Sequence, residues 1–218
     1  MTSKNTSSEH NQDDKLSVIA HSTLQLLSYI KPESLDNFTC KKGNNYHLQS
    51  DEILFITSGI YMLKNTEDSL CILINDTTIA IGLEKIIPTC KNRIYISAMD
   101  NIDFYTIKKN KLIDIINENA LWEIIAKIYC FQLSYFIDDR YSKIIKKNNY
   151  DTIKELIYEY IAMPNEIRSK IKLANYIIER SNISRSNTLK ILSALQHLKH
   201  LKMERGALQS VDCLPDRI

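Results

Sequence analysis

Hydrophobic residues recur at two different spacings along the chain, and the change of spacing divides it into three parts. From Lys15 to Ile30, and again after Lys111, the apolar positions follow the three- and four-residue steps of amphipathic helices. Between Tyr46 and Ile107 they gather in short runs separated by Asn, Asp, Lys or Gly, which is typical of strands. The pattern predicts a helix, then a small β-domain, then a helical C-terminal part.

Short strands at fairly regular intervals are expected in the β-domain. Gly59 marks the turn between the first two strands, and Asn75-Asp76 separates the next two. Such a set is typical of a sandwich or a roll. The expected strands are residues 53–56, 60–63, 70–74, 78–81, 94–96 and 104–107.

A long helix is expected from residue 118 to residue 147, where Asn148-Asn149 interrupts it, and a further helix at 150–160 before Pro164. The long helix has two apolar stripes, and both must be buried. One stripe can cover the β-domain. The other needs a second helix, most simply its own copy in a homodimer, although a core helix of a single chain is the alternative. The stripes are Leu121, Ile124, Ile128, Phe131 and Tyr135, and Trp122, Ala126, Tyr129, Leu133 and Phe136.

Two further helices joined by a three-residue turn are predicted between residues 171 and 198. Apolar residues at 173, 177 and 178 mark the first helix, and those at 188, 191, 192, 195 and 198 recur on one face of the second. Ser184 stands where an N-cap is expected. This is a helix-turn-helix, whose second helix, residues 184–197, can lie in the major groove of DNA.

Polar residues on the N-terminal half of that second helix point away from its apolar face. Arg can bond both O6 and N7 of a guanine, Ser can bond either partner of a base pair, and Lys can bond a guanine or a phosphate. The candidate DNA-binding residues here are Arg185, Ser186, Asn187 and Lys190.

A basic hairpin is predicted after this helix, with Gly206 in the turn at positive φ. Lys202 and Arg205 on this hairpin are expected to contact the DNA backbone, so the whole region is a winged helix-turn-helix. Two alternatives remain open, an ordinary helical hairpin with a solvated charged face, and a module that docks a protein partner instead of DNA.

Charge is distributed unevenly over the 218 residues. The formal net charge is only +2, but residues 166–206 contain nine Lys or Arg against three acids. That segment therefore carries +6, and the remainder must carry −4. A basic C-terminal module on a mildly acidic body is expected of a DNA-binding protein.

No pattern in the chain points to catalysis, a cofactor or a metal. Paired carboxylates, a Ser-His-Asp order and a cluster of metal ligands are all missing, so we expect no enzyme activity. The five cysteines are scattered without a C-x-x-C pair, which favours buried free thiols in a reducing cytoplasm over a redox or metal site. No signal peptide or long apolar run is present, so a soluble cytoplasmic protein without membrane contact is expected.

The order of β-roll, long helix and winged helix resembles the CRP/FNR superfamily of bacterial transcription regulators. Within it the chain is similar to the enterobacterial type named for inhibition of hydrogen peroxide resistance. The resemblance implies an α+β fold with a cyclic-nucleotide-binding-like β-roll at 15–117, after a disordered tail at 1–14. It also implies a dimerisation helix at 118–147 and a DNA-binding domain at 148–218. The stretches that carry it are residues 119–122, 149–151, 167–171, 175–177, 184–186 and 214–215.

The resemblance implies a dimeric regulator that binds double-stranded DNA, with a part in stress response and RNA polymerase as a candidate further partner. Arg185, Ser186 and Lys190 would contact bases. The chain departs from the cyclic-nucleotide-binding members, because Gly82 and Glu84 are out of register for a Gly-Glu pair and bulky Ile94 follows Arg93. A phosphate needs close backbone N–H groups and an accessible Arg, so we expect no binding of cyclic AMP.

Overall fold

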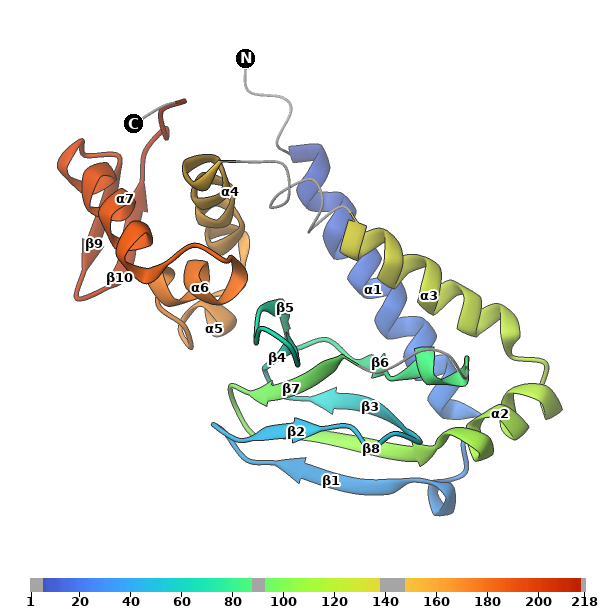
Figure 1. Ribbon diagram of the computed structural model, residues 1–218. Coiled ribbons are helices and arrows are strands. Elements are labelled where there is room, and N and C mark those ends of the chain that lie inside the picture. The colour runs from blue at the N-terminus through green and yellow to red at the C-terminus, as the bar shows by residue number, and fades with distance from the viewer. Residues whose placement is uncertain (1–5, 88–92, 138–147, 217–218) are drawn as a thin grey trace. The chain divides into compact units, whose positions relative to one another are not determined.

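The computed structural model describes residues 6–87, 93–137 and 148–216, and the side chains of residues 6–14 and 136 are outside this description. The chain divides into two compact units (Figure 1). The first contains the described residues up to 137 except 68–72. The second contains residues 148–216 together with 68–72.

Two four-stranded antiparallel sheets form the β-roll of the first unit. Their strand orders are β1-β8-β3-β6 and β2-β7-β4-β5. The strands expected from the sequence are confirmed, and two short strands at 36–40 and 45–47 were missed. The bounds are β1 Asp36–Cys40, β2 Asn45–His47, β3 Glu52–Ser58, β4 Tyr61–Asn65, β5 Cys71–Asn75, β6 Ile79–Ile81, β7 Ile94–Ala98 and β8 Ile102–Lys108.

Gly59 lies in the turn between β3 and β4 with φ 89°. A Cβ at this position would lie 2.2 Å from the main-chain oxygen of Asn101. Only glycine fits such a close approach of two backbones, which explains why the sequence places it between two apolar runs.

Helices α1, Thr6–Ser28, and α3, Trp122–Phe136, lie along each other beside the roll (Figure 1). Residues 6–14, which we expected to be part of a disordered tail, belong to helix α1. Gln132 on α3 donates a hydrogen bond to the main-chain oxygen of Ala80 on β6 (3.0 Å). The core between helices and sheets consists of Leu26, Ile30, Ile53, Phe55, Ala80, Leu83, Ile107, Leu112, Ile116, Leu121, Ile124, Ile125 and Ile128.

The long helix expected from residue 118 is divided near its start. Helix α2, Lys109–Glu118, ends there, and Ala120 adopts a positive φ of 54° before α3 begins. The Trp122 indole N–H donates to the side-chain oxygen of Asn117 across this corner (2.9 Å). The expected continuation over 138–147 falls outside the described residues.

The second unit is a helical domain closed by a two-stranded hairpin. The helix expected at 150–160 is confirmed as α4, and Asn148 caps it by accepting a hydrogen bond from the Asp151 N–H (2.8 Å). The bounds are α4 Asn149–Ala162, α5 Asn165–Arg168, α6 Leu173–Arg180, α7 Arg185–His197, β9 Leu201–Glu204 and β10 Ala207–Val211.

A short tail after β10 packs back onto α4. The Leu214 side chain is 3% exposed. The hydroxyl of Tyr150 donates to the main-chain oxygen of Pro215 (2.5 Å), and the Lys154 ammonium donates to the same oxygen (3.0 Å). The winged domain is therefore completed by residues beyond its wing.

Candidate nucleic-acid interface

Helix α7 begins as the sequence predicts. The Ser184 hydroxyl accepts a hydrogen bond from the Asn187 N–H (3.4 Å), which satisfies one of the free N–H groups of the first turn. Thr188, Leu192 and Leu195 are at most 2% exposed and form the buried face of the helix. Leu198, which we had placed in that apolar set, is 55% exposed and was wrongly assigned to the core.

The opposite face of α7 presents the predicted contact residues. Arg185, Ser186 and Lys190 are exposed, and Asn187 is half-buried. The hydroxyls of Ser184 and Ser186 lie 3.2 Å apart. The structure thus brings the four predicted residues of this helix together at its N-terminal end.

A buried ionic network fixes α6 against α4. The Arg180 side chain is 1% exposed, and its guanidinium donates to the Glu159 carboxylate of α4 (2.8 Å). The Tyr176 hydroxyl donates to the same carboxylate oxygen (2.5 Å). At the C-terminal end of α6, where the turn begins, the Ser181 hydroxyl donates to the Ile177 oxygen (2.7 Å). The helix pair that presents α7 is therefore held by polar as well as apolar contacts.

The wing is a β-hairpin whose turn consists of two residues. Arg205 and Gly206 both have positive φ, 50° and 82°, as a type I′ turn requires. Ala207 pairs with Glu204 on either side of the turn. Lys202 and Arg205 are exposed, so both predicted wing cations are available to a partner.

Lys172 lies against the wing tip, and sequence reasoning had not singled it out. It is the N-cap residue of α6, and its side chain is exposed. A Cβ on Gly206 would lie 3.2 Å from Lys172 Cδ and 3.7 Å from its Nζ. A Lys directly before a predicted helix was the available signal, but only the fold shows that the wing tip reaches it.

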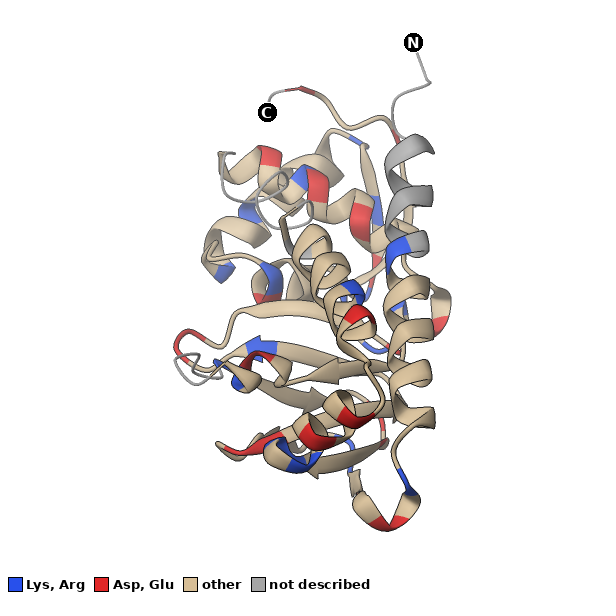
Figure 2. Ribbon diagram, turned by 90° about the vertical axis from the view of Figure 1, so that its right-hand side faces the viewer, with Lys and Arg blue, Asp and Glu red and all other residues tan. Residues whose placement is uncertain are grey.

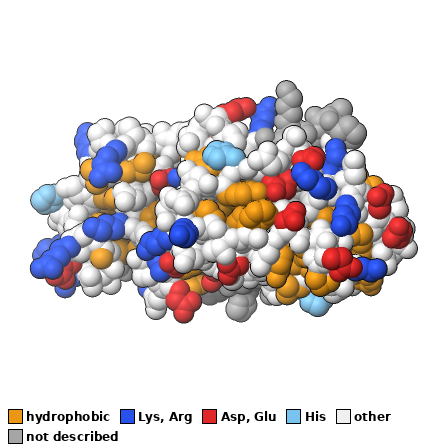
Figure 3. Space-filling model, turned by 90° about the horizontal axis from the view of Figure 1, so that it is seen from below, with side chains coloured by type: hydrophobic (Ala, Val, Ile, Leu, Met, Phe, Trp, Pro, Cys, Tyr) orange, Lys and Arg blue, Asp and Glu red, His pale blue; other side chains and the backbone are white. Residues whose placement is uncertain are grey.

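No carboxylate neutralises these cations within the part of the chain that the structure describes. Arg185, Lys190, Lys202, Arg205 and Lys172 all lack an ion pair with any described acid. On the face drawn in Figure 3, Lys and Arg side chains also occupy the left-hand end with few acidic neighbours. An exposed set of unpaired cations favours binding to a polyanion.

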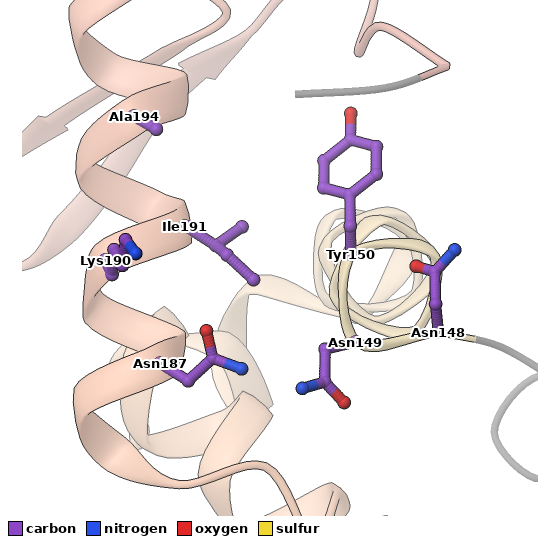
Figure 4. Close-up of a pocket in the computed structure, with 7 residues that line it drawn as sticks. All are labelled: Asn148, Asn149, Tyr150, Asn187, Lys190, Ile191 and Ala194. Carbon is purple, nitrogen blue, oxygen red and sulfur yellow. The ribbon is translucent and has the colours of Figure 1, made fainter.

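A hollow of about 630 Å³ lies beside α7 (Figure 4). Helix α7 lines it with Asn187, Lys190, Ile191 and Ala194, and the start of α4 lines it with Asn148, Asn149 and Tyr150. Ile191 points into the hollow and is half-buried, so it is not the core residue that its spacing predicted.

The segment around Gly82, which departs from a phosphate-binding cassette in sequence, is filled by side chains of the protein itself. Leu83 and Lys85 follow Gly82, and they are 1% and 4% exposed. The Lys85 ammonium donates to the main-chain oxygens of Gln49 (2.5 Å) and Glu52 (2.9 Å). Burial lowers the pKa of this ammonium.

Arg93 follows this segment in the sequence and lies on the surface. Residues 88–92, which connect the two, are outside the described part of the chain. The Arg93 guanidinium pairs with Glu67 at 3.4 Å, and the side chain is 67% exposed. In this arrangement the guanidinium faces a carboxylate of its own chain.

The two stripes of α3 have different environments. Leu121, Ile124 and Ile128 are buried in the core of the first unit. Trp122, Ala126 and Leu133 of the other stripe are exposed, and Tyr129 between them is half-buried. Glu123 and Lys127 are the charged residues of α3, which Figure 2 shows as almost wholly uncharged.

The thiols are not all buried, contrary to our expectation. Cys40 and Cys71 are buried, Cys130 and Cys213 are exposed, and none of these four forms a disulfide. Cys90 falls outside the described residues. Within the described ranges, no three His, Cys, Asp or Glu side chains are placed to hold a metal ion, and no helix is long and apolar enough to span a membrane.

Comparison with known proteins agrees with this architecture. Residues 149–216 match the winged helix-turn-helix DNA-binding family. The chain is 26% identical to the inhibitor of hydrogen peroxide resistance of Escherichia coli K12 over 208 residues, which cover 87% of this chain and 99% of that relative. It is 31% identical to the protein of the same name from Salmonella typhimurium over 113 residues, or 51% of this chain and 53% of that one.

Two solved structures share the fold. The c-di-GMP-responsive global regulator of Xanthomonas campestris superposes with a TM-score of 0.70 at 12% identity, covering 88% of this chain and 100% of that one. A CRP/FNR-family transcriptional regulator from Eubacterium rectale superposes with a TM-score of 0.65 at 16% identity, covering 88% and 90%. The family match therefore assigns residues 149–216 to a DNA-binding winged helix-turn-helix, and the two solved structures show that the chain shares their fold.

Proposed function

We propose that the protein is a dimeric, cytoplasmic regulator that reads a specific DNA sequence by placing α7 in the major groove. The observation that carries the proposal is the set of unpaired cations, which share the exposed side of α7 and the wing. Arg185, Ser186, Asn187 and Lys190 would face base edges and neighbouring phosphates. Lys202, Arg205 and Lys172 would contact phosphates only.

Dimerisation is proposed through the exposed stripe of α3. The stripe advances in alternating steps of four and three residues through Trp122, Ala126, Tyr129 and Leu133, which is the spacing of a two-helix seam. Trp122 and Leu133 are 47% and 59% exposed, so this chain leaves them largely uncovered. A second copy of the same helix would bury both.

A two-fold symmetric dimer has two reading helices and therefore a near-palindromic site. The two half-sites are expected about one helical turn, or roughly 34 Å, apart. Selection of bound sequences from a random pool, with full-length protein, tests this directly. Enrichment of an inverted repeat supports the proposal, whereas an enriched pool without any common sequence contradicts sequence-specific reading.

The second candidate function is docking of a protein partner by the winged helix, for which the cationic face would be incidental. Binding to random duplex DNA at several salt concentrations separates the two functions. Each neutralised phosphate contributes about −0.9 to the slope of log K against log salt. A slope near zero would favour the protein partner.

A role in oxidative-stress control is proposed from similarity to relatives named as inhibitors of hydrogen peroxide resistance. Deleting the gene and measuring survival in hydrogen peroxide tests it. The resistant phenotype that the relatives' name describes would support the role, and unchanged survival would contradict it.

We further propose that the β-roll does not respond to cyclic AMP. The buried Lys85 ammonium already serves two main-chain oxygens, and Leu83 beside it is 1% exposed. Calorimetric titration of the full chain with cyclic AMP should give no saturable heat. Saturable binding at micromolar concentration would contradict this proposal.

A further inference from the structure

A large apolar side chain lies on the exposed side of α7, where the domain's packing does not need it. Leu189 is 44% exposed, whereas Leu192 and Leu195 on the same helix are 2% and 0% exposed. At about 100° per residue, Leu189 projects between Arg185 and Ser186 and lies one turn further along the helix. It is therefore part of the surface that carries the unpaired cations.

Single exposed leucines are common on protein surfaces and need no explanation by themselves. The position of Leu189 is informative because its exposed neighbours on α7 are all polar or charged, namely Arg185, Ser186, Lys190 and Ser193. The major groove offers one apolar group to such a side chain, the C5 methyl group of thymine. Over any other base edge, Leu would displace water without replacing its hydrogen bonds.

We infer that Leu189 is a specificity-determining residue that packs on the C5 methyl group of a thymine. The inference rests on the proposed reading of the major groove by α7. Leu189 lies about 6 Å along the helix axis from Arg185. Since base pairs are spaced by about 3.4 Å, the thymine lies one or two base pairs from the one that Arg185 reads.

Replacing thymine by deoxyuridine tests the inference, because it removes only the methyl group. Each thymine of the selected binding site is replaced in turn, and the affinity of the full-length protein is measured. One thymine per half-site should show a loss of about fourfold, the effect expected for one methyl-sized group. In the Leu189→Ala variant, the same replacement should have no effect.

Leu198→Ala is the matched control. Leu198 is 55% exposed and follows the end of α7, so the variant loses a similar side chain outside the reading surface. It should keep the fourfold response to deoxyuridine. Leu189→Ala should also keep the wild-type affinity for random duplex DNA, which shows that the variant is folded.

The inference is overturned if no thymine responds to deoxyuridine, or if the response persists in Leu189→Ala. Either result leaves sequence-specific binding in place, so the proposed function would survive. If the wild-type protein prefers no sequence, the proposed function fails first, and the inference fails with it.

Discussion

The two units of the chain leave chemically different surfaces without a partner. In the first unit, Lys85 is bound by main-chain oxygens, Lys108 pairs with Asp51 (3.0 Å) and Lys127 with Glu123 (2.7 Å). Trp122 and Leu133 of the apolar stripe of α3 are among the large apolar side chains that remain exposed there. In the second unit, most apolar side chains are buried, and the cations of α7 and the wing remain open.

This contrast separates two kinds of recognition. An uncovered apolar stripe gains free energy by leaving water, and a second copy of the stripe satisfies it fully. Exposed cations gain little from burial but attract a polyanion over a distance. This contrast is the basis for our proposal that the first unit self-associates and the second binds a nucleic acid.

The largest expected effect comes from introducing an aspartate into either stripe of α3. Leu133→Asp places an uncompensated charge in the proposed seam, where its burial would cost about 3–5 kcal/mol. Sedimentation at micromolar concentration should then show folded monomers, compared with wild-type dimers. Ile128→Asp, at a residue that is 0% exposed, should unfold the first unit instead. A wild-type monomer, or a dimer that tolerates Leu133→Asp, would contradict the proposed interface.

A smaller effect, a loss of stability, is expected when the buried Lys85 ammonium is removed. Lys85→Met keeps the length of the side chain but removes the ammonium donor from the buried main-chain oxygen of Glu52 and the part-buried one of Gln49, at a cost of about 1–3 kcal/mol. Urea unfolding followed by the fluorescence of Trp122, the single tryptophan, reports this in the first unit.

Lys108→Ala is the control for this measurement, because its exposed pair with Asp51 contributes at most about 1 kcal/mol. If Lys85→Met were as stable as the wild type, the Lys85 ammonium would not be a structural group. The proposal that the β-roll is closed to cyclic AMP would then lose its support.

The sequence predicted the second unit better than the first because the signals of the second unit are local. A cap at Ser184, a turn at Gly206 and helical spacing of apolar residues each depend on a few neighbouring residues. The α7 residues that we predict to contact DNA could be placed on one exposed face for the same reason. Lys172 was missed because its place beside the wing tip depends on residues more than thirty positions away.

In the first unit, the errors arose where burial depends on distant elements. The sequence showed two stripes on α3 but could not show which one the roll and α1 cover. The stripe that contains Ile128 belongs to the core, so a substitution there cannot test an interface between two copies. The predicted burial of Ile191 and Leu198 in the second unit was wrong for a similar reason. Helical spacing alone does not show that a residue faces an open hollow or lies at the end of a helix.

The reading face of α7 should respond to the shape of the side chain as well as to its charge. Arg185→Ala should cost about 1–3 kcal/mol on the selected site and relax the preference at one base pair. Arg185→Lys keeps the charge but lacks the two-pronged fork, so it should retain affinity for random DNA and lose the base preference. Competition binding with single-base variants of the site measures both.

Gln196→Ala, an exposed residue on the C-terminal half of α7, should leave the preference unchanged. Equal losses by Arg185→Ala on specific and random DNA would show that Arg185 contacts a phosphate. The assignment of α7 as the reading helix would then be wrong.

The smallest effect per residue is expected at the wing, where the contacts depend on charge alone. Lys202→Ala and Arg205→Ala should each weaken binding to all duplexes alike and flatten the salt slope by about one unit. Lys108→Ala removes a cation from the β-roll, where Asp51 already neutralises it, so the slope should not change. A wing variant that altered the preferred sequence while keeping the slope would show that the wing reads bases. The contrast between a reading helix and a positioning wing would then have to be abandoned.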